Sequence, residues 1–202
     1  DPFDYFSLRA ALTIHGPFPL VHEVSGTGLL YGRKFEHGDG NRSLWGIFQD
    51  YDYFDSRIYQ FGGQSVGAGI LSRFKSRSAM RVYTGVQLNA VILGGSNVGF
   101  ETADGREYNY TTGSKFKMFV ALDHRKYGAL AIRYWIYWFH TISGAKGDEF
   151  IHYAQAAFNP RIYKKWGLGL EYTYYLRDSY FNDYPESHLK NIELRTFASY
   201  KF

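Results

Sequence analysis

The stretch KNIELRTFASYKF, residues Lys190–Phe202, alternates between two kinds of side chain along its whole length. Leu194 and Phe202 fall on one side of an extended chain, and Glu193 and Arg195 fall on the other, because successive side chains of a strand point to opposite faces. A period of two over this length predicts a β-strand rather than a helix. We therefore expect this strand to separate an apolar environment from a polar one.

The same alternation recurs throughout the 202 residues of the chain. Each run is close to the ~9–11 residues that a tilted strand needs to cross a bilayer. An up-and-down sheet with both termini on one side needs an even number of strands. The pattern gives ten and leaves eight or twelve open. The predicted strands are Phe6–His15, Val24–Phe35, Ser43–Phe54, Ser65–Phe74, Met80–Leu93, Ser114–Asp123, Ala129–Thr141, Phe150–Phe158, Leu168–Arg177 and Asn191–Phe202.

The predicted strand 80–93 has a clear separation of faces. Val86 and Leu88 alternate with Gln87 and Asn89. In a soluble antiparallel sheet the apolar face forms the core and the polar face is solvated, whereas in a transmembrane barrel the apolar face meets lipid and the polar face fills the lumen. The polar faces of this chain mix glycine, tyrosine, phenylalanine and charged residues, which suits a lumen filled by side chains.

The connections between the predicted strands fall into two alternating kinds. Four are short and basic or glycine-bearing, such as KSRSA at 75–79, and five are longer and richer in glycine, aspartate and aromatic residues. Short turns on one side and long loops on the other are typical of outer-membrane barrels. This pattern predicts that both termini are periplasmic. It also makes the longest predicted loop, residues 94–113, a candidate for binding a partner or a glycan.

The composition excludes several classes of protein. Hydrophobic residues make up 45% of the chain, yet the mean hydropathy is −0.35, and no stretch approaches the ~18 apolar residues of a membrane-spanning helix. The absence of cysteine removes thiolate chemistry and disulfides, and a net charge of +4 is too small to indicate nucleic-acid binding. We expect no cofactor and no metal, because no three or four ligands are suitably spaced.

The end of the chain resembles the C-terminal signature of bacterial outer-membrane β-barrel proteins, with apolar or aromatic side chains at alternate positions and Tyr200 and Phe202 last. The resemblance implies that these two residues form the assembly signal read by the barrel-assembly machinery. It also implies contact with outer-membrane lipid and lipopolysaccharide, and leaves room for a membrane-protein partner. Residues 2–10, PFDYFSLRA, and 167–181, GLGLEYTYYLRDSYF, are similar to barrels of unassigned function from Gram-negative bacteria.

Two enzyme families with small barrels offer a comparison for catalysis. The outer-membrane phospholipase and the lipid A 3-O-deacylase place His and Ser two residues apart on one strand, so that both side chains share a face. None of the seven histidines of this chain is followed two residues later by serine. We therefore expect no enzyme. The best remaining cluster, His140 with Ser143, Asp148 and Glu149, is expected to be a solvated loop.

By the alternation of faces, eight charged residues are expected to form the polar network of the lumen: Arg9, Arg73, Arg81, Asp123, Arg133, Glu171, Glu193 and Arg195. Lys115 and Lys117 share that face, and Asp50 and Asp52 also fit it. Unpaired charges in a narrow lumen are costly, so we expect these groups to form ion pairs. On this basis Glu171 can neighbour Glu193 or Arg195.

Together these patterns predict a single domain, residues 1–202, that forms an all-β antiparallel up-and-down transmembrane β-barrel of about ten strands in the outer membrane of a Gram-negative bacterium. The expected function is that of a non-enzymatic structural or accessory subunit of a complex, or of a surface-binding protein, with a side-chain-filled lumen. A narrow, porin-like channel for small solutes or ions is the alternative, and a lipid-modifying hydrolase is the third. The start at Asp1 leaves open whether the chain is a mature form or part of a longer protein.

Overall fold

The fold is known from a computed structural model, which describes residues 6–14, 20–55, 60–75, 79–102, 105–163 and 166–200. Nearly all of these residues are in strands. The strands are β1 (Phe6–Ile14), β2 (Leu20–His37), β3 (Asn41–Asp55), β4 (Gln60–Lys75), β5 (Met80–Thr102), β6 (Gly105–His124), β7 (Gly128–Ser143), β8 (Gly147–Tyr163), β9 (Trp166–Phe181) and β10 (Ser187–Tyr200), with a short 3₁₀ turn at Gly38–Gly40 between β2 and β3.

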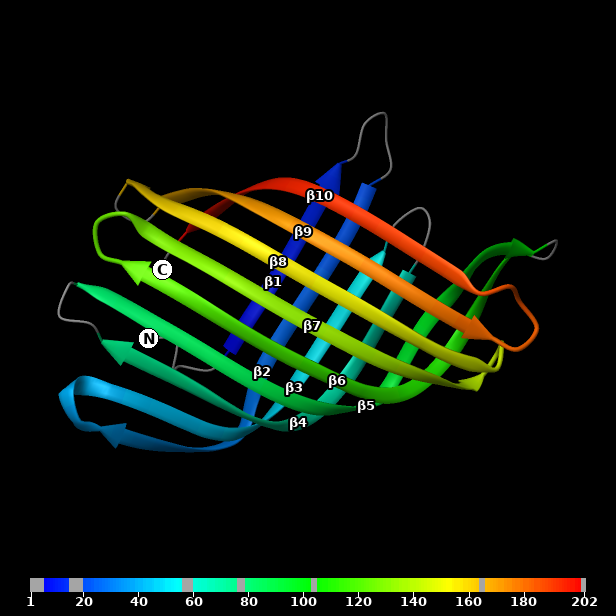
Figure 1. Cartoon of the computed structure of the whole chain (residues 1–202), viewed down its shortest axis with the longest axis horizontal. Helices are drawn as coiled ribbons and strands as arrows, with labels where there is room; N and C mark the ends of the chain where they lie inside the picture. The colour runs from blue at the N-terminus through cyan, green and yellow to red at the C-terminus, as the bar shows by residue number, and fades with distance from the viewer. Residues whose placement is uncertain are drawn as a thin grey trace.

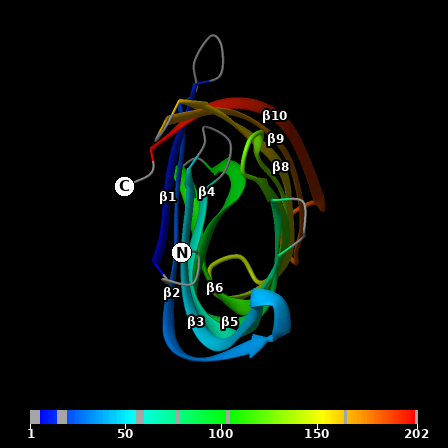
Figure 2. The same ribbon diagram turned by 90° about the vertical axis from the view of Figure 1, so that its left-hand side faces the viewer.

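The strands form one antiparallel sheet in which each strand pairs with its neighbour in the sequence, from β1 to β10 (Figure 1). The end-on view in Figure 2 shows that the sheet curls round on itself. The prediction of an all-β, antiparallel, up-and-down fold is therefore confirmed. Within the described ranges, the pairings run from β1·β2 to β9·β10, and no pairing of β1 with β10 is present.

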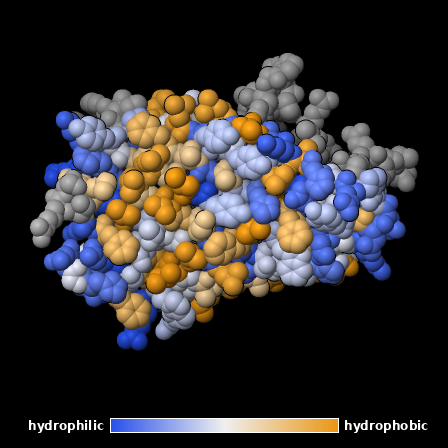
Figure 3. Space-filling view, in the orientation of Figure 1, coloured by the Kyte–Doolittle hydropathy of each residue, from blue (hydrophilic) through white to orange (hydrophobic). Residues whose placement is uncertain are grey.

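The curl divides the side chains into a concave face and an outer face. On β5, Gln87 and Asn89 point inward and are buried, whereas Val86 and Leu88 point outward and are exposed, as the alternation predicts. Figure 3 shows apolar side chains gathered across the strands of the face toward the viewer, with hydrophilic side chains toward both ends. Among the described residues, no helix has the length and apolar character needed to cross a membrane.

The prediction of a long loop at residues 94–113 is wrong. β5 continues to Thr102 and β6 begins at Gly105, and the two strands pair from Gly94↔Thr111 to Thr102↔Gly105 across register shifts. The segment contains alternating aromatic and polar residues, such as Tyr108 and Asn109, which favour strand over loop. The glycines that suggested a loop instead lie within a hairpin that extends the sheet at this end.

Candidate functional site

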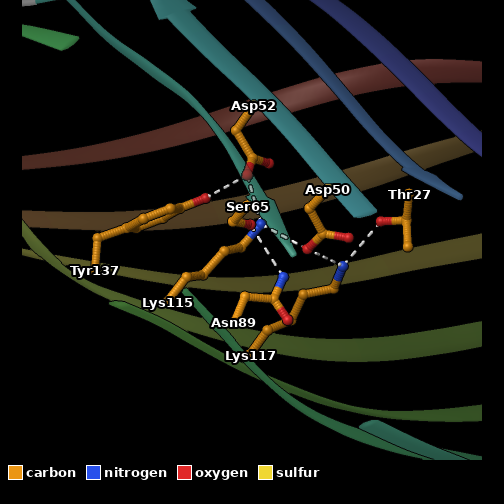
Figure 4. A network of polar contacts seen from close by, with 8 residues as sticks. All are labelled: Thr27, Asp50, Asp52, Ser65, Asn89, Lys115, Lys117 and Tyr137. Carbon is orange, nitrogen blue, oxygen red and sulfur yellow. Dashed lines mark hydrogen bonds and ion pairs between the residues drawn. The ribbon is translucent and has the colours of Figure 1, made fainter. Parts of the chain in front are cut away.

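A cluster of four charged side chains occupies the concave face in the middle of the sheet (Figure 4). β3 supplies Asp50 and Asp52, and β6 supplies Lys115 and Lys117. These strands are not neighbours, because β4 and β5 lie between them. Each charge therefore reaches its partner over two intervening strands.

Small side chains on β4 leave the space for this crossing. Its inward positions beside the cluster are Ser65 and Gly67. A Cβ atom at Gly67 would collide with the backbone oxygen of Leu88 and with the side chain of Asn89, so glycine permits close approach of β5 here. Asn89 in turn donates a hydrogen bond from Nδ2 to Ser65 Oγ at 3.0 Å.

Lys115 is the centre of the cluster. Its Nζ donates to Asp50 Oδ2 at 2.8 Å and to Asp52 Oδ2 at 2.5 Å. The side chains of Lys115 and Asp50 are each only 1% exposed. Tyr137 Oη also donates to Asp52 Oδ2, at 2.7 Å, and the Lys115 ammonium lies 5.2 Å from the centre of the Tyr137 ring. A buried ammonium is thus surrounded by two carboxylates and an aromatic face, which offset its loss of hydration.

Lys117 completes the cluster at its more accessible edge. Its Nζ lies 3.1 Å from Asp50 Oδ2 and donates to Thr27 Oγ1 at 2.9 Å. The Lys117 side chain is 20% exposed. The four charges contribute two positive and two negative groups, so the cluster is formally neutral.

A second buried ion pair joins β8 and β9. Arg177 donates to Glu149 Oε1 through Nε at 2.7 Å and through Nη2. Ser179 Oγ donates to the same oxygen at 3.2 Å, and Ser96 Oγ on β5 donates to Oε2 at 2.5 Å. Glu149 is fully buried, so the expectation that it belongs to a solvated loop is wrong. Glu149 lies on the same face of β8 as Ile151 and Tyr153, because these residues are two positions apart. The alternation of the strand could therefore have identified Glu149 as an inward residue.

Aromatic side chains fill much of the concave face near these ion pairs. The Phe61 ring lies 5.7 Å from that of Tyr137 and 6.5 Å from that of Tyr175, measured between ring centres. Phe139 and Tyr153 are buried in the same cluster. The interior is therefore packed by side chains around the central cluster and the Glu149–Arg177 pair.

The predicted lumen residues mostly lie along the concave face. Arg73, Glu171 and Glu193 are buried. Arg133 Nη1 donates to Gln155 Oε1 at 2.7 Å, and Asn191 Nδ2 donates to Glu193 Oε1 at 2.7 Å. Alternation assigned Asp50, Asp52, Lys115 and Lys117 to this face, but it could not show which distant strand each charge meets.

The remaining predicted residues lie at the edges of the described structure. Arg81 is exposed and is paired in register with Asp123. The register of β9 and β10 places Arg195 opposite Glu171. The side chains of Arg9, Arg195 and Tyr200, and the whole of Phe202, lie outside the described part of the chain.

Two histidine–aspartate pairs lie on the outer face. His140 Nδ1 is 2.8 Å from Asp148 Oδ1, and His188 Nδ1 is 2.7 Å from Asp178 Oδ1. Ser143 is in register with Tyr110 rather than beside His140. Within the described ranges, no group of three or more His, Cys, Asp or Glu residues is arranged to hold a metal ion.

Comparisons with known proteins add no family to these observations. No protein-family model, no curated protein and no solved structure matches the chain.

Proposed function

We propose that the chain is an integral β-barrel protein of about ten strands in a bacterial outer membrane, with periplasmic termini and a lumen filled by side chains. Its role is non-enzymatic: a structural or accessory subunit of a membrane complex, or a surface-binding protein. Its partners are outer-membrane lipid and lipopolysaccharide, the barrel-assembly machinery during biogenesis, and a membrane protein in the accessory role.

The observation that carries this proposal is where polar and apolar side chains lie: many large apolar side chains are exposed on the outer face, whereas charged side chains are buried on the concave face. Large apolar side chains are on the outer face, where Leu88 is 62% exposed, Ile132 58% and Leu194 73%. Charged side chains are buried on the concave face. A soluble antiparallel sheet buries its apolar face. Apolar side chains that remain exposed over a large contiguous surface mark a site where a partner covers that surface. A lipid bilayer covers such a surface on all sides, as in transmembrane barrels.

Closure of the sheet follows from the same proposal. An open sheet in lipid would leave the backbone groups of β1 and β10 without hydrogen-bond partners, at a cost of several kcal/mol per group. The curl seen end-on in Figure 2 supports closure between these two strands. In a closed barrel the charged cluster and the Glu149–Arg177 pair would lie inside the lumen.

A structural role for the lumen is supported by the pairing of charges in its central cluster and in the Glu149–Arg177 pair. The central cluster and the Glu149–Arg177 pair are each neutral, and their polar atoms bond to one another across the interior. Together with the aromatic side chains they act as a plug that holds opposite walls of the sheet together.

An arginine substitution on the outer face tests the membrane location. In vesicles, Leu88→Arg should lower the free energy of unfolding by about 2–4 kcal/mol, because a charge near the bilayer midplane is costly. Urea unfolding of the reconstituted protein measures this change. The control is Tyr127→Arg, at an exposed turn position between β6 and β7, where the cost should be within about 1 kcal/mol. The proposal would be contradicted if Leu88→Arg and Tyr127→Arg lowered the free energy of unfolding equally and the protein was soluble without detergent, with no heat-modifiable migration on gels.

A narrow channel is the second candidate function. It is favoured by buried polar side chains on the concave face of several strands, among them Gln87, Thr111 and Thr173. Planar-bilayer recordings separate the two candidates. Discrete openings that change in Arg133→Ala would favour a channel, whereas a silent bilayer containing correctly folded protein would favour the plugged barrel.

A further inference from the structure

The outer face has a slot near one end of the sheet. This is the end where β3 leads into β4 and where the β5–β6 hairpin continues beyond its neighbours. The strand registers place Tyr53, Gly62, Gly95 and Tyr110 side by side on β3, β4, β5 and β6. We call this row and the adjoining Tyr51 and Tyr108 the tyrosine slot. It is part of a cavity of about 340 Å³, near the lower end of the ~300–1,000 Å³ of small-molecule sites.

The row has a floor of glycine and walls of tyrosine. Gly62 and Gly95 are direct cross-strand neighbours, so the floor is two strands wide and has no side chains in this row. Because strands lie ~4.8 Å apart, the Cα atoms of the two walls are separated by about 14 Å, before the rings narrow the gap. A Cβ atom at Gly62 would meet the Tyr53 ring at 3.3 Å, which shows that this ring stands directly beside the floor.

The chemistry of the slot is uncharged and largely apolar. None of the side chains that line the cavity is ionisable near neutral pH. Gln60 Nε2 already donates to Tyr53 Oη at 2.7 Å, and Ser96 is turned inward to Glu149. These polar groups are therefore not directed at an occupant. Gln64 and the tyrosines at 51, 108 and 110 also line the cavity, but the lining has no positive charge that would suit a phosphate headgroup.

We propose that the tyrosine slot binds a single fatty acyl chain of a membrane lipid, which lies over Gly62 and Gly95 between the two tyrosine walls. The slot is continuous with the exposed apolar side chains Leu93 and Ile92 of β5, so that an acyl chain can enter it from the surrounding bilayer. This inference rests on the proposed membrane location of the outer face. It goes beyond that location because it assigns a specific binding site for one lipid chain, in addition to the general contact of the outer face with the bilayer.

Photocrosslinking from within the bilayer tests the slot. The protein is reconstituted in phosphatidylcholine vesicles that carry a diazirine in one acyl chain, irradiated, and mapped by mass spectrometry. We expect severalfold higher labelling of Tyr51–Tyr53 and Tyr108–Tyr110 than of the outward segment Leu168–Leu170. Added lipopolysaccharide that reduces the labelling would assign the chain to lipopolysaccharide, and unchanged labelling would assign it to phospholipid; both results support the slot.

Gly95→Leu should abolish the excess labelling, because its side chain fills the floor. A Cβ atom at Gly95 would have the backbone oxygen of Asn109 as its neighbour, at 3.5 Å, which is an ordinary contact distance, so the Cβ itself causes no clash. The matched control is Ala90→Leu, an exposed outward position on the same strand, which should leave the labelling intact. Uniform labelling of the outer face, labelling that persists in Gly95→Leu, or crosslinks from the slot to a second copy of the chain would each overturn the slot.

Vesicle flotation separates this inference from the proposed function. Protein that floats with vesicles but is labelled uniformly would refute the slot alone. Protein that does not float would refute the membrane location, and the slot is then tested with a diazirine fatty acid in buffer. In that arm, labelling at the slot that is lost in Gly95→Leu supports the site, and the absence of such labelling overturns it.

Discussion

Replacing Lys115 with methionine should lower the free energy of unfolding by about 3–5 kcal/mol, because removing one partner of a buried ion pair leaves the other uncompensated. Lys115 contacts both Asp50 and Asp52, and its side chain is almost fully buried. Without it, the remaining cation of the cluster is Lys117, which lies 3.1 Å from Asp50. The change is measured by unfolding the protein with urea in detergent micelles. The loss of heat-modifiable migration on gels reports the unfolded fraction.

Two comparisons show whether the charge itself is responsible. Lys117→Met should cost less, since that side chain is more exposed and forms one ion pair, with Asp50. Combining Lys115→Met with Asp52→Asn should restore part of the loss, because the second change removes an unpaired carboxylate. Equal costs for the two lysine variants, without restoration in the double variant, would show that solvent reaches the cluster freely.

Replacing Glu149 with glutamine should have a comparable effect, again about 3–5 kcal/mol. The substitution keeps the volume of the side chain but removes the Glu149 charge from beside the buried Arg177 guanidinium. Two serine hydroxyls, those of Ser96 and Ser179, also lose a charged acceptor. Because Ser96 belongs to β5, the variant should loosen the link between distant walls of the sheet as well as the β8–β9 pair.

The control for Glu149→Gln is Glu36→Gln. Glu36 forms an ion pair with Arg42 at 3.1 Å, but its side chain is 73% exposed. Exposed pairs contribute about 0–1 kcal/mol, so this variant should unfold at nearly the same urea concentration as the unaltered protein. A midpoint for Glu149→Gln within the range of the Glu36→Gln control would contradict the proposed importance of the buried pair.

The alternation of side chains predicted much of this fold. The period of two around Leu88 and Asn89 correctly assigned an outer and an inner face, and each predicted strand overlaps a strand of the structure. Parity also placed Asp50, Asp52 and Lys115 on one side of the sheet. These features are local, because they depend only on how successive residues of a strand point.

The pairing of charges across the interior could not be predicted in the same way. Lys115 meets Asp50 because the sheet curls and because Ser65 and Gly67 leave space between them, and curvature is not encoded in any single strand. The extended β5–β6 hairpin was missed because the glycines at 94 and 95 resemble a loop signal. In the structure, those glycines lie in paired strands, and Gly95 forms part of the tyrosine slot.

The contact between β3 and β6 has a consequence for incomplete chains. Each strand pairs with its neighbour in the sequence, but Asp50 and Asp52 lie 65 and 63 residues before Lys115. A sheet that lacks β6 would have both carboxylates on its concave face without this cation. We therefore expect a chain truncated before β6 to dehydrate its concave face less completely than the whole chain.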